Sequence, residues 1–162
     1  MADKKITELN ELTDPAVGDL TVVVDDPSGT PETKKSTLQK IADLLASLSQ
    51  TLTNKRITKR VSTVASSATP TPNADTDDIY TVTALAEAAT FGAPTGTPTN
   101  GQGLVIRIKD NGTARALSFN AIYRAVGVTL PTTTVAGKTI YIGALYNSAD
   151  TKWDVVAVAS ET

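Results

Sequence analysis

The sequence contains neither cysteine nor histidine, and these two absences exclude several kinds of chemistry. Without cysteine the chain has no disulfides and no thiolate ligands for a metal. Without histidine it lacks the most common general base, the usual zinc ligand and the side chain that titrates near neutral pH. We therefore predict that the protein is not an enzyme, with no catalytic residues, no cofactor and no metal site.

Aromatic residues and long hydrophobic runs are also scarce. Aromatics make up 4% of the 162 residues, and valine, leucine, isoleucine and alanine supply most of the apolar content. Strands built from these small and medium-sized side chains form thin cores. A thin core favours burial that is completed by other subunits. No run approaches the roughly 18 apolar residues of a membrane span, and the amino terminus lacks the apolar core of a signal peptide. We expect a soluble protein without a membrane span.

Charge gives no sign of a nucleic-acid partner. The formal net charge is −2, which provides no general attraction to nucleic acid or to an anionic membrane. Residues 51–60 (TLTNKRITKR) are locally basic, but no aromatic residues lie among these charges to stack on bases. We interpret this segment as a solvated basic linker.

The stretch Pro98–Val128 carries the clearest strand signal. Residues 103–109 (GLVIRIK) alternate between apolar and other residues, and DNG at 110–112 predicts a tight turn. Apolar residues within 114–119 then predict the returning strand of a hairpin. An isolated hairpin is only marginally stable, so the flanking segments must supply further strands.

Short β-rich runs separated by turn residues fill the rest of the second half. The proline-rich segment 68–78 is expected to be a loop. The last two runs predict a second hairpin with Trp153, Val155 and Ala157 on one face. The pattern predicts an antiparallel, jelly-roll-like β-sandwich over residues 57–162. The additional predicted strands are 57–66, 79–85, 129–136, 138–145 and 152–158.

The first 50 residues predict a small α+β module, so the chain as a whole is expected to be mainly β with one helix. Residues 19–25 (DLTVVVD) and 32–35 (ETKK) are candidate strands on either side of a Pro/Gly turn. Ser36 or Thr37 is a plausible N-cap for a helix over about 37–50.

An apolar stripe runs along this predicted helix at alternating steps of three and four. It lasts only two heptads, whereas a coiled coil is normally recognised over three or four. Two interpretations remain open: an amphipathic helix packed on the small local sheet, or a short parallel bundle of three copies about a symmetry axis. In the second case the oligomer interface consists of Leu38, Ile41, Leu45, Leu48 and Leu52.

Two acidic clusters are the candidate cation sites, at Asp25-Asp26 and at Asp75, Asp77 and Asp78. A calcium loop supplies six to eight oxygens at a fixed spacing around a glycine. NADTDD, residues 73–78, lacks both that spacing and the glycine, so we interpret it as a solvated turn.

Two acids are candidates for catalysis, and the four tyrosines with Trp153 could form a sugar-stacking surface, although Tyr141 and Trp153 more simply fit alternating strand positions. Glu87 and Asp110 could form the carboxylate pair of a glycoside hydrolase, but nothing in the sequence brings them together. Tyr123 and Tyr146 are candidate contacts for a glycan. We keep carbohydrate binding as an alternative function.

Two stretches resemble structural proteins of tailed bacteriophages. Residues 4–45 resemble the short N-terminal modules of phage fibre and tail proteins. The segments 52–61, 79–125 and 134–158 look like a C-terminal β-domain common among phage fibre and head-fibre proteins. The most specific parts are GQGLVIRIKDNGTARALSFN, residues 101–120, and YNSADTKWDVV, residues 146–156.

This resemblance implies a component of the phage particle that is made in the host cytoplasm. Such proteins are usually homotrimers whose N-terminal part docks on the particle while the β-domain projects from it. The expected partners are other copies of the chain and capsid or tail proteins of the same virion. A head fibre, a capsid decoration protein and a tail accessory protein all remain open, as does a host-receptor or carbohydrate-binding module on the particle.

Overall fold

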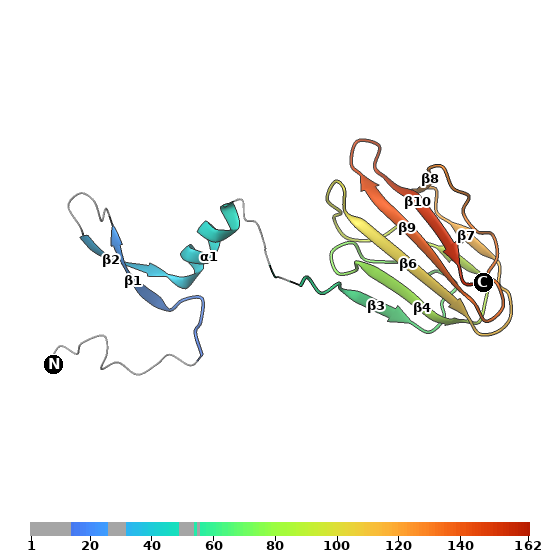
Figure 1. Ribbon diagram of the computed structural model, residues 1–162, viewed down its shortest axis with the longest axis horizontal. Helices are drawn as coiled ribbons and strands as arrows, with labels where there is room; N and C mark the ends of the chain where they lie inside the picture. Colours follow the sequence, from blue (N-terminus) through green and yellow to red (C-terminus); the bar gives the residue numbers. More distant parts are fainter. Residues whose placement is uncertain (1–13, 26–31, 49–53, 55) are drawn as a thin grey trace. The chain divides into compact units, whose positions relative to one another are not determined.

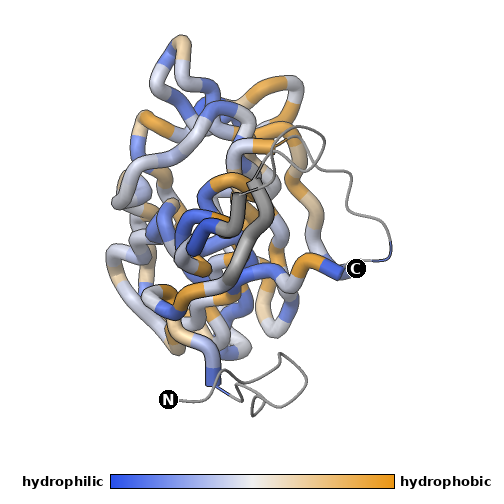
Figure 2. Tube along the Cα trace, turned by 90° about the vertical axis from the view of Figure 1, so that its left-hand side faces the viewer, coloured by the Kyte–Doolittle hydropathy of each residue, from blue (hydrophilic) through white to orange (hydrophobic). Residues whose placement is uncertain are grey.

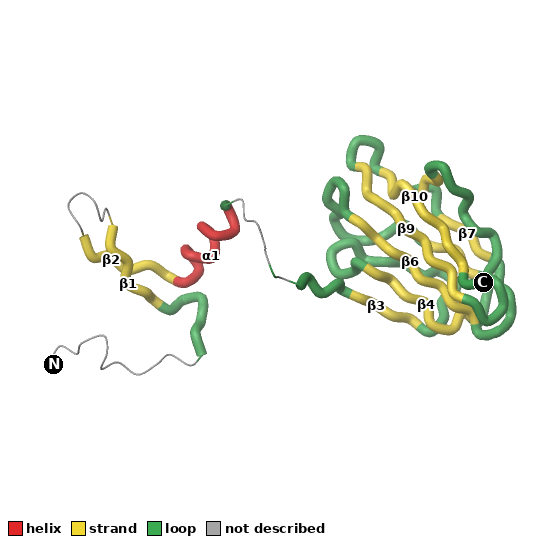
Figure 3. Tube along the Cα trace, in the orientation of Figure 1, coloured by secondary structure: helices red, strands yellow, loops and turns green. Residues whose placement is uncertain are grey.

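The computed structural model describes residues 14–25, 32–48, 54 and 56–162. The chain divides into two compact units, unit 1 (Met1–Lys55) and unit 2 (Arg56–Thr162), and the division falls inside the predicted linker 51–60. The described residues contain strands, loops and a single helix (Figure 3). The prediction of a mainly β chain with one helix is confirmed.

Unit 1 consists of a β-hairpin followed directly by a helix (Figure 1). The helix starts where predicted, because the hydroxyl of Thr37 accepts a hydrogen bond from the backbone N–H of Lys40 at 3.2 Å. It ends at Ser47, three residues earlier than predicted. The elements are the antiparallel strands β1 (Leu20–Asp25) and β2 (Glu32–Thr37) and the helix α1 (Leu38–Ser47).

Unit 2 is built on a six-stranded main sheet in the order β3-β4-β6-β9-β10-β8 (Figure 1). Its strands are β3 (Val61–Val64), β4 (Ile79–Leu85), β6 (Gly103–Asp110), β8 (Tyr123–Ala125), β9 (Thr139–Asn147) and β10 (Lys152–Ser160). The short strands β5 (Ala89–Phe91) and β7 (Leu117–Phe119) pair with each other in a second, two-stranded sheet.

Strand direction in unit 2 differs from the prediction. β3, β4 and β6 run parallel to one another, as do β8 and β10, and only β9 pairs antiparallel with both of its neighbours. The prediction of antiparallel pairing throughout is therefore wrong, and the jelly-roll-like sandwich is not confirmed. The reason is that long connections, such as the loop between β3 and β4, let the chain cross over and re-enter in the same direction.

The predicted hairpin over residues 103–119 does not form. β6 forms as predicted, but the chain after it leaves the main sheet, and β7 pairs with β5 instead. The Asp110 carboxylate accepts hydrogen bonds from the N–H groups of Gly112 and Gly137, both at 2.7 Å, so the turn is tied to the segment before β9. Phe119 stacks on Phe91 with ring centroids 5.2 Å apart. These long-range contacts outweigh the local turn signal.

The other predicted strands have mixed outcomes. The hairpin of β9 and β10 is confirmed, and β4 occupies the predicted residues. The predicted strand 129–136 is wrong, since that segment contributes only an isolated bridge between Ala116 and Thr133. A bulge between Val155 and Ala157 also turns Ala157 outward, so it does not share the buried face of Trp153.

The core lies on one face of the main sheet. Alternate residues of β6 point inward and pair with alternate residues of β9, for example Ile106 with Ile142, both fully buried. Trp153 of β10 and Phe91 of β5 complete this core. Burying each such side chain is worth about 1.5–3 kcal/mol, so unit 2 closes a substantial core of its own.

Candidate functional site

Helix α1 presents its apolar stripe without burying it. None of its ten residues is buried. Among the predicted interface residues, Leu38 and Ile41 are half-buried, whereas Leu45 and Leu48 are 51% and 54% exposed. Leu52 lies outside the described residues. The local hairpin therefore does not cover the second half of the stripe, which favours the interpretation that copies of the helix pack together.

The main sheet of unit 2 leaves its second face open, and we call this the outer face. It carries the residues between the buried ones, such as Val105 of β6 and Tyr141 and Leu145 of β9. Val61, Val156, Tyr141 and Leu145 are all about half exposed there. Exposed apolar residues gathered on one face commonly mark an interaction surface.

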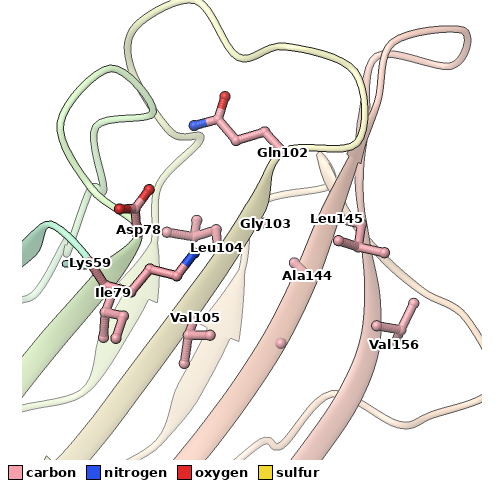
Figure 4. A pocket seen from close by; sticks show the side chains of 11 residues that line it. Lys59, Asp78, Ile79, Gln102, Gly103, Leu104, Val105, Ala144, Leu145 and Val156 are labelled. Carbon is pink, nitrogen blue, oxygen red and sulfur yellow. The ribbon is translucent and has the colours of Figure 1, made fainter. Parts of the chain in front are cut away.

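An apolar groove of about 370 Å³ lies on the outer face (Figure 4). Ile79, Val105, Leu145 and Val156 line it, and Lys59 extends across one end toward β6. Gly143 also lines the groove and adds no side chain to it. A Cβ at this position would lie 3.4 Å from the Cβ of Ala157. The groove offers apolar contact, the ammonium of Lys59 and the amide of Gln102. Its one carboxylate, Asp78, already accepts hydrogen bonds from the guanidinium of Arg60.

The acidic loop 73–78 is a structural element. Asp77 is buried, and its carboxylate accepts hydrogen bonds from the hydroxyls of Ser62 and Thr76 and from the N–H of Asn73. Asp75 accepts from the N–H of Thr97 at 2.8 Å. These hydrogen bonds tie the loop to itself, to Ser62 and to Thr97, so the acids have a structural role. No group of three or more metal-binding side chains gathers in the described part of the chain; Asp26 lies outside it, and the side chain of Asp25 is not described.

Arg60, the last residue of the predicted basic linker, is bound to this loop. Its guanidinium donates to both carboxylate oxygens of Asp78, at 2.8 and 3.3 Å, and to the carbonyl oxygen of Asp75, while its backbone N–H also donates to Asp78. The hydrogen bonds from the side chain and backbone of Arg60 lower the pKa of Asp78 to about 2. Arg60 therefore fixes the start of unit 2 and is not a free charge for a phosphate.

Glu87 and Asp110 each bind other groups. Glu87 accepts from the hydroxyl of Ser66 at 3.2 Å. Burial alone would raise the pKa of Asp110, but the N–H donors of Gly137 and Gly112 outweigh it and lower that pKa. A general acid in a glycoside hydrolase needs a raised pKa, so this pair does not have the arrangement of a catalytic acid and its partner.

The two tyrosines chosen as glycan contacts are not exposed platforms. Tyr123 is buried, its hydroxyl donates to the carbonyl of Gly92 at 3.1 Å, and burial raises its pKa. Tyr146 is half-buried with its ring 5.3 Å from that of Trp153. The buried ring of Tyr123 is therefore not accessible to a glycan, whereas a glycan contact at Tyr146 stays a prediction. Tyr141, which the sequence pattern treats only as an alternating strand position, is 41% exposed on the outer face, and its place between Ile140 and Ile142 in KTIYIGAL marks it as outward-facing.

Comparison with known proteins gives no relative. No family model matches this chain, and no curated protein or solved structure matches it. Within the described residues, no helix is long and apolar enough to cross a membrane, and hydrophobic stretches along the trace are short (Figure 2).

Proposed function

We propose that this chain is a non-enzymatic structural protein of a bacteriophage particle. In this proposal it is a short trimeric fibre or decoration protein, anchored to the capsid or tail by unit 1, with unit 2 exposed. The resemblance of residues 4–45 and 101–120 to phage fibre proteins supports the phage assignment. The observation that carries the assembly part is α1, a helix with an apolar stripe and no buried residue.

Assembly would proceed through burial of the exposed leucines. Three copies of α1 placed about one axis would remove Leu45 and Leu48 from water, and each fully buried leucine is worth about 1.5–3 kcal/mol. A stripe of two heptads is short, so further contacts from unit 1 would add to the interface. Three linked copies would also attach to a particle at three points, which strengthens binding through effective concentration.

The absence of enzymatic activity in this proposal has its own support. Among the acids that the sequence singles out, those with described side chains accept hydrogen bonds from neighbouring donors, and the pKa values of Asp78 and Asp110 are lowered. The pKa of Tyr80 is raised by burial, as is that of Tyr123, so neither phenol ionises more readily than usual. None of these four groups is shifted toward the neutral pKa that suits a general acid or base.

The mass of the purified protein in solution tests the assembly. Light scattering at about 10 µM should give three times the 16.9 kDa of one chain. Leu45→Asp should reduce the mass to that of one chain, because a carboxylate cannot be buried among leucines without a partner. Ala46→Asp adds the same charge to the same helix away from the stripe and should leave the trimer intact. A wild-type monomer at this concentration would refute the trimer.

The virion assignment has a separate test. Purified particles of a phage that encodes this chain should contain it, and image reconstruction of those particles should place density for unit 1 against the capsid or the tail. If the protein is made during infection and is absent from finished particles, the assignment is wrong whatever the oligomeric state proves to be.

A further inference from the structure

A second, smaller pocket lies on the outer face beside the apolar groove, and its chemistry is different. Its volume is about 200 Å³, and strands β4, β6 and β9 form it. Hydroxyl-bearing and basic side chains dominate the lining, which consists of Thr81, Thr83, Arg107, Lys109, Thr139 and Tyr141 together with Val82. The proposed assembly through α1 leaves this pocket without a role.

Arg107 is the unusual member of this pocket. Two other arginines of unit 2 are neutralised by acids: Arg60 pairs with Asp78 at 2.8 Å, and Arg124 pairs with Asp154 at 2.7 Å and with Asp150 at 2.8 Å. No acidic side chain in the described part of the chain forms an ion pair with Arg107. The residue as a whole is nevertheless half-buried, and water screens a partly buried charge less well.

The sheet holds this guanidinium in position. Thr81, Arg107 and Tyr141 form one row across β4, β6 and β9. The Nε of Arg107 donates to the hydroxyl oxygen of Thr81 at 3.3 Å, and no hydrogen bond to another described residue uses its two Nη groups. A guanidinium fixed through Nε on a rigid sheet is preorganised to receive two oxygens of one carboxylate.

Lys109, the other cation of this pocket, does have an acidic neighbour. This neighbour is Glu161, whose pKa is lowered mainly by the N–H of Thr139 and to a smaller extent by the charges of Lys109 and Lys138. Lys109 is thus partly neutralised within the chain. Arg107 is the better candidate for recognising an external anion.

We propose that this pocket binds the carboxylate of an acidic sugar, such as a uronic acid residue within a polysaccharide. Arg107 would pair with the carboxylate, the exposed ring of Tyr141 would cover the apolar C–H face of the sugar, and the threonine hydroxyls would bond sugar hydroxyls. Typical small-molecule pockets exceed about 300 Å³. This smaller, solvent-open pocket suits one residue of a longer chain better than a compact metabolite.

Binding of the full-length protein to immobilised polygalacturonate, with neutral dextran as the reference, tests the proposal at about 0.15 M salt. Polygalacturonate should bind at least about tenfold more tightly than dextran, and Arg107→Gln should remove about tenfold or more of that affinity. Arg107→Lys keeps the positive charge but not the planar pair of N–H donors that binds both carboxylate oxygens. Its affinity should therefore lie between those of Arg107→Gln and the wild type. Tyr141→Ala should weaken binding without abolishing the preference for the acidic polymer.

Lys152→Gln is the matched control, since it also removes one positive charge but from β10, outside the pocket. It should change the affinity by less than about twofold. Equal losses in Arg107→Gln and Lys152→Gln would mean nonspecific charge attraction and would overturn the proposal, as would equal binding to both polysaccharides or no binding. Tighter binding to polyglutamate than to polygalacturonate would identify an acidic peptide surface and overturn the sugar assignment. Unchanged thermal unfolding of each variant shows that the pocket, not folding, is being tested.

Discussion

Unit 2 buries a core of its own, whereas the helix of unit 1 does not bury a single residue. In unit 2 the apolar residues of β6 and β9 alternate inward and meet each other across the sheet, so Ile106 and Ile142 are fully removed from water. In unit 1 the apolar stripe of α1 has the regular spacing of a packed helix, yet Leu45 and Leu48 are half exposed. Both units thus show regular apolar periodicity, but only in unit 2 are the residues of that pattern fully buried within the chain.

This difference indicates where each unit obtains its stability. A domain that buries a core of its own can fold without other copies, so its stability depends little on concentration even though unit 2 leaves apolar residues on its outer face. A helix whose stripe is completed by other copies is stabilised by mass action, so it becomes more stable as the protein concentration rises. The proposed anchoring unit is therefore the part of the chain that responds to assembly, and the exposed β unit is the part that does not.

The largest expected effect is on the core of unit 2. Ile142→Ala removes a fully buried side chain and should lower the free energy of unfolding by about 3 kcal/mol, because it leaves a cavity that neighbouring strands cannot close. Urea unfolding followed through the fluorescence of Trp153, the only tryptophan, measures this directly.

Leu44→Ala is the comparison for that variant. Leu44 is 60% exposed in α1, so its truncation should change the same unfolding curve by less than about 0.5 kcal/mol. Equal losses in the two variants would contradict the contrast between the two units.

A smaller effect concerns the start of unit 2. Asp78 has its pKa lowered to about 2 by Arg60, below the value of about 3.9 expected for an unfolded chain. The folded state therefore gains stability that is fully present above pH 4 and is lost as the pH falls through 2. Asp78→Asn should cost about 1 kcal/mol at pH 7, a modest amount because Arg60 is half exposed.

Thermal melts of the two proteins across pH check this prediction. The melting temperatures of wild type and Asp78→Asn should differ at pH 7 and converge toward pH 2. A constant difference at every pH would show that the Arg60–Asp78 ion pair is not its source.

Sequence reasoning located most elements but not how they pair. The alternation in GLVIRIK and KTIYIGAL predicts β6 and β9 well, and Thr37 is the N-cap that the start of α1 requires. The DNG turn at 110–112 was also located, but not the direction of the chain beyond it. That direction depends on Gly137 bonding Asp110 and on Phe119 stacking against Phe91, which are contacts between residues far apart in the sequence.

The candidate sites likewise separate into features set by local sequence, which were predictable, and features set by long-range packing, which were not. The stripe on α1 was predictable because helical spacing is a local property. Tyr123 was misjudged because an aromatic residue in a short strand shows its burial only once the strand has a neighbour, here β10. Arg107 could not be singled out from sequence, since its distinction is a place beside Thr81 and Tyr141 on the outer face with no ion-paired acid among the described residues, and that depends on the packing of three strands.

Hydrogen exchange at two protein concentrations tests the contrast between the units most directly. Peptides covering α1 should exchange more slowly at about 100 µM than at about 1 µM, because assembly covers the helix, while peptides from β6 and β9 should exchange at the same slow rate at both concentrations. If α1 is equally protected at both concentrations in a monomeric protein, the helix does not depend on other copies, and the account of unit 1 as an assembly module is contradicted.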